Sequence, residues 1–190
     1  MSTIFFITHP EVVVEPTRPI ARWHLSDMGI ARMRAFAASS AMSEIRSIWA
    51  STETKAIESA GILAGAHGLP ISIHPGLDEN DRSATGYLPP EEFQRTADAF
   101  FANPHESVRG WERAIDAQRR VATAFEAIVT GSSPGDIAIV AHGGVGTLLY
   151  CHLAKLAISR QHDQPAQGCY WSCARDRRVS HHAWRSIGSA

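Results

Sequence analysis

Short apolar runs alternate along the chain with longer segments in which apolar residues recur every three or four positions. An uninterrupted apolar run between helical segments indicates a strand that is buried on both faces of a sheet. We predict strands at Thr3–His9, Arg46–Ala50, Ile71–Ile73 and Asp136–Ala141. Because helical segments separate these runs, most of the strands should be parallel, with helices on both faces of the sheet.

The helical segments have recognisable ends. Ser26 is a good N-cap for a helix that extends to about Ala38, and Gly68 should stop a second helix that begins near Thr52 and continues to about Ala66. Three further helices are predicted, from Pro90 through Phe101, from about Gly110 to Val129, and over Val145–Ala157.

The remaining segments predict loops, a small helical cap and a hairpin at one edge of the sheet. Prolines at 10, 16 and 19 indicate an ordered loop after the first strand, and residues 74–90 form a long polar loop rich in Gly and Pro. The helices after this loop suit a small cap, and Gly168–Ala174 with Val179–Trp184 suits a closing antiparallel hairpin. The predicted fold is a single α/β domain over residues 1–190, a three-layer α/β/α arrangement with a mostly parallel sheet, an antiparallel edge hairpin and a small helical cap inserted at about 74–110.

Composition narrows the class of protein. The 190 residues carry a net charge of −1, which argues against a general nucleic-acid or membrane-surface role, although all but two of the 18 basic residues are Arg. An odd count of three cysteines favours reduced thiols over a disulfide framework, and the first apolar run is too short for a secretory or membrane segment. We therefore expect a cytoplasmic protein that needs no cofactor.

Two histidines stand where the chemistry of an α/β sheet collects. His9 ends the first strand, and His142 ends the strand at Asp136–Ala141, just before two glycines. The carboxyl ends of parallel strands open onto one crevice, where the N-termini of the following helices favour anions. Two imidazoles facing such a pocket indicate phosphoryl transfer, whereas the alternative for His9 alone is an ordinary histidine at a strand end.

These residues resemble the histidine phosphatase superfamily, also called phosphoglycerate mutase-like, over nearly the whole chain. The resemblance is carried in order by His9 at the end of the first strand, the helix start Leu25-Ser26-Asp27-Met28-Gly29, the strand-to-helix turn Ala50-Ser51-Thr52-Glu53-Thr54-Lys55-Ala56, the acidic loop around Glu79, and His142-Gly143-Gly144. It implies that His9 becomes phosphohistidine and that His142 holds phosphoryl oxygens. Glu79 would protonate the leaving oxygen, with Asp78 and Asp81 as the alternatives.

The departures from the family pattern concern phosphate binding. The usual opening Arg-His-Gly is replaced by Thr8-His9-Pro10, which removes a guanidinium and a backbone N–H, and Lys55 stands where the turn usually carries Arg. Lys55 is expected to contact phosphate, because a cation at a helix start opposes the local dipole unless an anion is present; the alternative is a solvated side chain. Arg82, or else Arg22, is the candidate to replace the missing guanidinium.

The resulting prediction is a metal-independent phosphatase that acts through phosphohistidine on an unidentified phosphomonoester. A phosphomutase is one alternative, and a catalytically impaired member that binds a phosphorylated ligand or protein is another. A metal-dependent hydrolase ranks last, because the histidines show no paired ligand spacing, and Cys169 with Cys173 suits packing on one strand face better than metal binding. The expected partner is a small phosphorylated substrate, and a phosphoprotein is the alternative. Binding to nucleic acid or to a membrane is not expected, and no oligomeric state is predicted.

Overall fold

A computed structural model describes residues 2–176, 180 and 182–188. Six strands form one sheet in the order β3-β2-β4-β1-β5-β6. Their bounds are β1 Thr3–Thr8, β2 Ile45–Ala50, β3 Ile71–Ile73, β4 Asp136–Ala141, β5 Cys169–Ala174 and β6 Arg185–Ser186. The pairs β1–β4, β2–β4 and β2–β3 are parallel, and β5 is antiparallel to both β1 and β6. The predicted mixed sheet with a mostly parallel centre is confirmed.

The register at the centre of the sheet places the two histidines side by side. Thr8 of β1 is paired with Ala141 of β4, and the backbone N–H of His9 donates to the Ala141 carbonyl at 3.2 Å. His9 and His142 therefore leave adjacent strands at the same edge.

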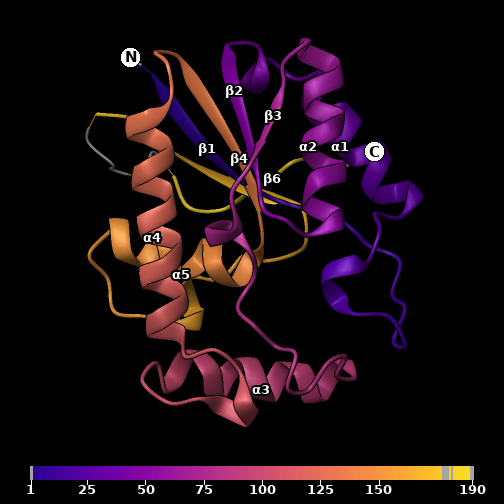
Figure 1. The fold of residues 1–190 in the computed structure, drawn as a ribbon, viewed down its shortest axis with the longest axis vertical. Helices are drawn as coiled ribbons and strands as arrows, with labels where there is room; N and C mark the ends of the chain where they lie inside the picture. The colour runs from indigo at the N-terminus through magenta and orange to yellow at the C-terminus, as the bar shows by residue number, and fades with distance from the viewer. Residues whose placement is uncertain (1, 177–179, 181, 189–190) are drawn as a thin grey trace.

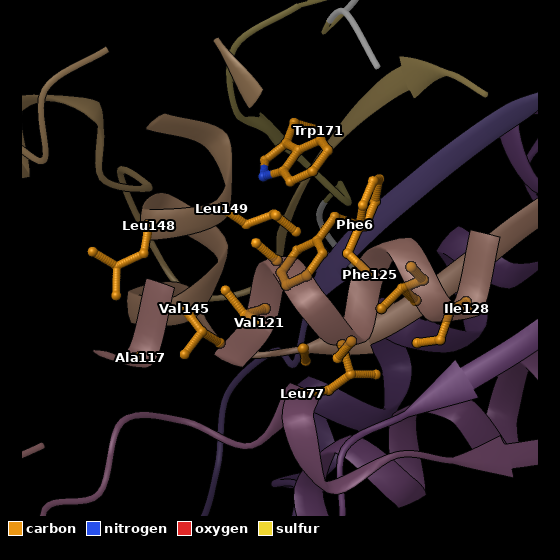
Figure 2. Close-up of a cluster of buried hydrophobic side chains, with 14 of the residues drawn as sticks. Phe6, Leu77, Ala117, Val121, Phe125, Ile128, Val145, Leu148, Leu149 and Trp171 are labelled. Atoms are coloured by element: carbon orange, nitrogen blue, oxygen red, sulfur yellow. The ribbon is translucent and has the colours of Figure 1, made fainter. Parts of the chain in front are cut away.

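Five α-helices surround the sheet within the described residues. They are α1 Asp27–Ala37, α2 Thr54–His67, α3 Pro90–Ala102, α4 Ala114–Gly131 and α5 Gly143–Leu153. Figure 1 shows α1 and α2 on one face and α4 and α5 on the other. Each face has its own apolar core, and Figure 2 shows Phe6 of β1 among Val121 and Phe125 of α4, Leu149 of α5 and Trp171 of β5. The two cores fix the central strands from both sides.

The predicted capping of the first two helices is confirmed. The Ser26 hydroxyl accepts the Gly29 N–H at 3.1 Å, and Gly68 ends α2 in the left-handed region at φ 64°. Two other boundaries differ from prediction. The helix expected from Gly110 begins only at Ala114, and α5 ends at Leu153, because Lys155 takes a φ of 56° that a helix does not allow.

The segment between β3 and α4 extends beyond the sheet. Helix α3 lies at the lower end of the molecule in Figure 1, the end toward which β1 runs from the N-terminus. Phe100 and Phe101 of α3 are buried and join Trp111 in the core cluster of α4 and α5. The strand ends that carry the histidines consequently face a wall made by this segment.

The antiparallel edge differs in detail from prediction. The second strand was expected over Val179–Trp184, of which residues 179 and 181 lie outside the described part of the chain. Ser180 makes an isolated bridge with Cys173, but the described strand that pairs with β5 is β6, Arg185–Ser186. Trp184 packs instead against Trp171 and donates its indole N–H to the His162 carbonyl at 2.9 Å, so pairing resumes only after it.

Candidate active site

His9 is oriented by its own loop. Its Nδ1 lies 2.9 Å from the Pro10 carbonyl oxygen, which can only accept a hydrogen bond. Nδ1 must therefore carry the ring proton, and Nε2 keeps a free electron pair. Pro10, although it lacks a backbone N–H, thus supplies the carbonyl that selects the nucleophilic tautomer.

The surroundings of His9 keep its ring neutral. Burial lowers the pKa of His9 from its ordinary value of 6.5 to about 4, and the positive charges of Lys55 and Arg82 act in the same direction. The hydrogen bond to Pro10 and the negative charge of Glu53 oppose this shift without reversing it. At neutral pH the imidazole is therefore available as a nucleophile.

His142 lies beside His9 and is fully buried. The two rings meet edge to face, with their centroids 5.3 Å apart. Nε2 of His142 lies 2.7 Å from the Ser51 hydroxyl and 3.5 Å from Glu53 Oε1, whereas Nδ1 has no hydrogen-bond partner among the described residues. Burial holds the pKa of His142 well below 6.5, although the Glu53 carboxylate counteracts it. A buried ring nitrogen without a partner beside the His9 ring marks a position for a group that the protein does not supply.

Lys55 is buried, so the alternative that it is a solvated side chain is wrong. Its ammonium group forms an ion pair with the Glu53 carboxylate and donates to the Ile20 carbonyl at 2.9 Å. Only 3% of its side chain is exposed. An ammonium group has three donors, so one donor is left for a ligand of the cavity that Lys55 lines.

Glu53 is a residue of the site that our sequence analysis did not single out. One carboxylate oxygen contacts Lys55, and the other accepts the Glu79 N–H at 3.0 Å and faces His142. Burial alone would raise the pKa of Glu53, but His142 and Lys55 lower it from 4.5 to about 2, so the group is ionised. The available signal was its position in the turn before α2, two residues from the motif lysine.

Glu79 lies at the N-terminus of α5. Its carboxylate accepts the N–H groups of Gly144 at 3.1 Å and Val145 at 3.0 Å, and its backbone is fixed by Glu53. A Cβ atom at Gly144 would come within 2.7 Å of Glu79 Oε1, so glycine is required for this approach. The helix N-terminus that we expected to face a bound anion therefore holds a carboxylate of the protein itself.

The two alternatives to Glu79 lie outside the cavity. Asp78 accepts the backbone N–H and the hydroxyl of Thr52, both at 2.7 Å, and so holds the turn that leads into α2. Asp81 accepts the Ser83 N–H at 2.8 Å, and this bond lowers its pKa. Of the three carboxylates considered, Glu79 alone lines the cavity with His9.

The two candidate arginines occupy different environments. The Arg82 guanidinium lines the cavity, 4.0 Å from the Glu79 carboxylate and 5.3 and 5.6 Å from the ring centroids of Phe93 and Trp111. Arg22 is exposed at the end of a short 3-10 helix and does not line the cavity. The structure thus places only Arg82 with the site.

Thr8 occupies the place of the family's arginine without facing solvent. It is fully buried, donates to Gln164 Oε1 at 2.6 Å and accepts the Cys169 N–H at 3.0 Å. Gln164, which our sequence analysis also missed, lines the cavity with His9. No local signal identifies it, because it is 156 residues from Thr8 in the sequence.

One cavity of about 520 Å³ extends from His9 to the segment that contains α3, and neither His142 nor Glu53 lines it. His9, Lys55, Glu79, Arg82, Gly143 and Gln164 lie at one part of its wall, and aromatic residues contribute to the rest. The buried Asn80 also lines it, and its side-chain nitrogen has no hydrogen-bond partner among the described residues. The volume falls in the range of small-molecule sites.

Other candidate chemistry is not supported in the described part of the chain. Cys169 and Cys173 are buried in β5, as packing predicts, and His181, a histidine that follows them in the sequence and could have joined them as a metal ligand, lies outside the described residues. No cluster of three or more His, Cys, Asp or Glu side chains suited to a metal occurs among residues 2–176, 180 and 182–188. None of the described helices is both long and apolar enough to cross a bilayer.

Comparison with known folds agrees with this geometry. Bacillus stearothermophilus YhfR superposes with a TM-score of 0.78 at 21% sequence identity, covering 98% of this chain and 95% of that chain. A mycobacterial glucosyl-3-phosphoglycerate phosphatase in complex with VO3 gives 0.78 at 18% identity, covering 97% and 96%. Phosphoserine phosphatase from Entamoeba histolytica gives 0.78 at 15% identity, covering 98% of both chains. At these identities the similarity establishes the fold alone.

The family of the chain is identified by its sequence. No curated protein matches the chain. The family model described as histidine phosphatase superfamily (branch 1) matches residues 17–181, a range that begins after the unusual Thr8-His9-Pro10. With most of its length matched and with the fold of these phosphatases, the chain belongs to the histidine phosphatase superfamily.

Proposed function

We propose that the protein is a metal-independent phosphatase that hydrolyses a small phosphomonoester through a phosphohistidine on His9. The family supports phosphoric monoester hydrolysis as the type of reaction. The observation that carries the proposal is the state of His9, whose Nδ1 is bound to the Pro10 carbonyl and whose lowered pKa leaves Nε2 free at neutral pH. These are the requirements for nucleophilic attack on phosphorus.

In the first step the Nε2 electron pair of His9 forms a bond to phosphorus, and the bond between phosphorus and the ester oxygen breaks. The leaving oxygen takes that electron pair together with a proton from Glu79, which must enter this step in its protonated form. Support for this role comes from the position of Glu79 in the cavity wall and from its backbone bond to Glu53. The products are an alcohol and phosphohistidine.

In the second step a water molecule attacks the phosphoryl group and gives a proton to Glu79. The bond between phosphorus and Nε2 breaks, its electron pair returns to the ring, and inorganic phosphate leaves. His9 is again neutral, with its proton on Nδ1. One carboxyl group thus serves as acid and then as base, as microscopic reversibility requires.

The phosphoryl oxygens gain charge density during both steps and need donors around them. We assign this role to the ammonium group of Lys55, the guanidinium of Arg82 and Nδ1 of His142. Lys55 and Arg82 lie close enough to lower the pKa of His9, and the ring of His142 meets the ring of His9 edge to face. Ser51 can give its proton to Nε2 of His142, because Ser51 Oγ already accepts the Glu53 N–H at 3.3 Å, and Nδ1 then carries a proton for phosphate.

The cavity favours a small substrate over a phosphoprotein, because the enclosing wall includes the α3 segment as well as the sheet edge. A ligand-binding protein without turnover is the main competing function, since Thr8 and Lys55 replace arginines. The neutral, oriented His9 favours the enzyme. Turnover of an aryl phosphate in excess chelator tests this directly. Release of phosphate supports the phosphatase, binding without release supports the binder, and transfer to an added acceptor alcohol in place of water indicates a mutase.

A further inference from the structure

Thr8 and Gln164 form a pair that the family pattern does not provide. Thr8 is fully buried and lies directly before His9. The Cys169 N–H donates to the Thr8 oxygen, and the hydroxyl proton has two acceptors within reach, Gln164 Oε1 at 2.6 Å and the Cys169 carbonyl at 3.2 Å, of which Gln164 Oε1 is the nearer. That distance is typical of an O–H···O bond and short for an N–H···O bond. The amide oxygen of Gln164 is therefore the atom that faces Thr8.

The opposite end of the amide is then fixed as a donor. With Oε1 on Thr8, the Nε2 group lies over Gly143, where any Cβ atom would collide with it. Gly143 follows His142 and begins α5, and it lines the cavity with His9 and Gln164. In the His-Gly-Gly turn, Gly143 thus leaves room for the Gln164 side chain, and Gly144 leaves room for the Glu79 side chain.

The backbone of Gln164 is held independently of its side chain. Its N–H donates to Asp163 Oδ1 at 2.8 Å, and the same oxygen accepts the Thr147 hydroxyl of α5 at 2.9 Å. The amide group is consequently anchored at its base by α5 and at its oxygen by Thr8. A donor that is fixed in this way needs little reorganisation when a ligand arrives.

We propose that Gln164 is a substrate-binding residue whose Nε2 group donates a hydrogen bond to a phosphoryl oxygen, in the place of the guanidinium that Thr8 removes. The inference rests on the proposed phosphatase function. An amide offers two donors and no charge, so it restores the directed hydrogen bond but not the positive charge. The charge must then come from Arg82 and Lys55, which line the same cavity.

Replacement of Gln164 by Leu tests the proposal with an aryl phosphate as substrate and vanadate as inhibitor. Loss of one positioned donor to a developing oxyanion lowers the rate by about 10²-fold, and we expect a fall of that size in kcat/KM together with weaker vanadate inhibition. Gln161→Leu is the matched control, because Gln161 is exposed in the same turn and does not line the cavity. It should behave as the unmodified protein.

Gln164→Glu gives a second measurement, the pH dependence of vanadate inhibition, which would not change if Gln164 had only a structural role. A carboxylate there repels the phosphoryl group, so vanadate inhibition should be weakest at high pH and should recover relative to the unmodified protein as the pH falls. Equal kcat/KM and equal vanadate inhibition in Gln164→Leu and Gln161→Leu would overturn the inference. The proposed function would still stand if the unmodified protein turned over and His9→Ala did not.

A second inference concerns the alcohol part of the substrate and rests on the remainder of the cavity wall. The aromatic residues that line it are Trp23, Tyr87, Phe93, Phe100, Phe101 and Trp111. Trp23 and Tyr87 pack with their ring centroids 5.9 Å apart. Such a wall favours flat apolar groups.

The described basic side chains of the cavity offer no uncommitted positive charge to a second anionic group of the substrate. Three Lys and Arg side chains occur among the described residues that line it. Lys55 is paired with Glu53, and Arg160 is paired with Asp98 at 2.5 Å and donates to the Gln94 carbonyl at 2.9 Å. Arg82 is assigned to phosphate. We infer that the substrate is a phosphomonoester of an alcohol with an apolar, flat group and no second negative charge, an inference that also rests on the proposed function.

The inference can be tested with phosphate esters of alcohols that have similar basicity, because their leaving groups then do not differ in reactivity. We expect 2-phenylethyl phosphate to exceed propyl phosphate by about tenfold or more in kcat/KM and 3-phosphoglycerate by more. Tyr87→Ala should lower kcat/KM for 2-phenylethyl phosphate more than for propyl phosphate, so that the preference for the phenyl group narrows. Equal values for the two esters, or a preference for 3-phosphoglycerate, would overturn the inference, while turnover of propyl phosphate would show that the phosphatase function is intact.

Discussion

The imidazole rings of His9 and His142 lie edge to face, with their centroids 5.3 Å apart, at the ends of two adjacent parallel strands. The backbone is held at both residues, because the His9 N–H donates to the Ala141 carbonyl and the His142 carbonyl accepts the Gly146 N–H. The two imidazoles are thus positioned by the register of β1 and β4. A change in either ring should affect chemistry more than folding.

Replacement of His9 by Ala should abolish turnover and preserve the fold. The side chain contributes little to the two apolar cores, whereas in the proposed mechanism it forms the bond to phosphorus in the first step and releases it in the second. We expect a fall of about 10³-fold or more in kcat for an aryl phosphate, with an unchanged circular dichroism spectrum. His105→Ala, at an exposed position, is the control. Retention of more than a tenth of the activity would exclude His9 as the nucleophile.

Replacement of Lys55 by Met should weaken inhibition by phosphate and vanadate and also destabilise the protein. The variant leaves the buried Glu53 carboxylate without its ion pair, which typically costs about 3–5 kcal/mol. The double variant Glu53→Gln/Lys55→Met should recover much of the stability in denaturant titrations without recovering anion affinity. Lys55→Arg should retain inhibition. If Lys55→Met bound vanadate normally, Lys55 would be a structural partner of Glu53 only.

The pH dependence of kcat/KM should have its acid limb near pH 4, after correction for the second ionisation of the phosphate ester at about 6. His9 is active when neutral, and burial lowers its pKa from 6.5 to about 4. Activity should therefore stay high as the pH falls through 6.5. An acid limb near 6.5 that is retained after the correction would contradict the environment described for His9.

The same shift affects stability. Because the pKa of His9 is lower in the folded protein than in the unfolded chain, its contribution is fully present above pH 6.5 and is lost as the pH falls toward 4. His142, whose pKa is also lowered, acts in the same direction. In thermal unfolding measured at several pH values, His9→Ala should lose less stability between pH 6.5 and 4 than the unmodified protein. An identical loss in both would argue against the shift.

Arg82 and Arg22 should differ in their effect on catalysis. Arg82→Met removes a cation from the cavity wall, so kcat/KM should fall by at least about tenfold, whereas Arg22→Met removes an exposed side chain and should have no effect. Steady-state kinetics with one aryl phosphate separate the two. A larger effect of Arg22→Met would mean that the segment beside His9 rearranges when substrate binds.

Much of this fold and part of the site follow from the sequence because they depend on local patterns. The strand ends at His9 and His142, the N-cap at Ser26 and the turn at Gly68 were all predicted from neighbouring residues. The second strand of the edge hairpin is confirmed only at Ser180, which bridges Cys173, and its described pairing with β5 lies at Arg185–Ser186, beyond the predicted end, because Trp184 packs against Trp171.

The missed residues of the site share one property, which is that their roles depend on distant partners. Glu53 connects His142, Lys55 and Glu79, and Gln164 meets Thr8 across 156 positions. Likewise, Arg22 is nearer than Arg82 to His9 in the sequence, but only Arg82 lines the cavity. Spacing along the chain cannot rank such contacts, whereas the register of the sheet and the path of the loops determine them.

The central claim is that His9 carries the phosphoryl group between the two steps. Rapid mixing of the protein with a labelled aryl phosphate in excess chelator, alkaline quenching and peptide mapping test it most directly. We predict an acid-labile, alkali-stable phosphate on the peptide that contains His9, formed at a rate no lower than kcat and absent in His9→Ala. Full turnover without any such intermediate in the unmodified protein, or a phosphate on another residue, would contradict the account.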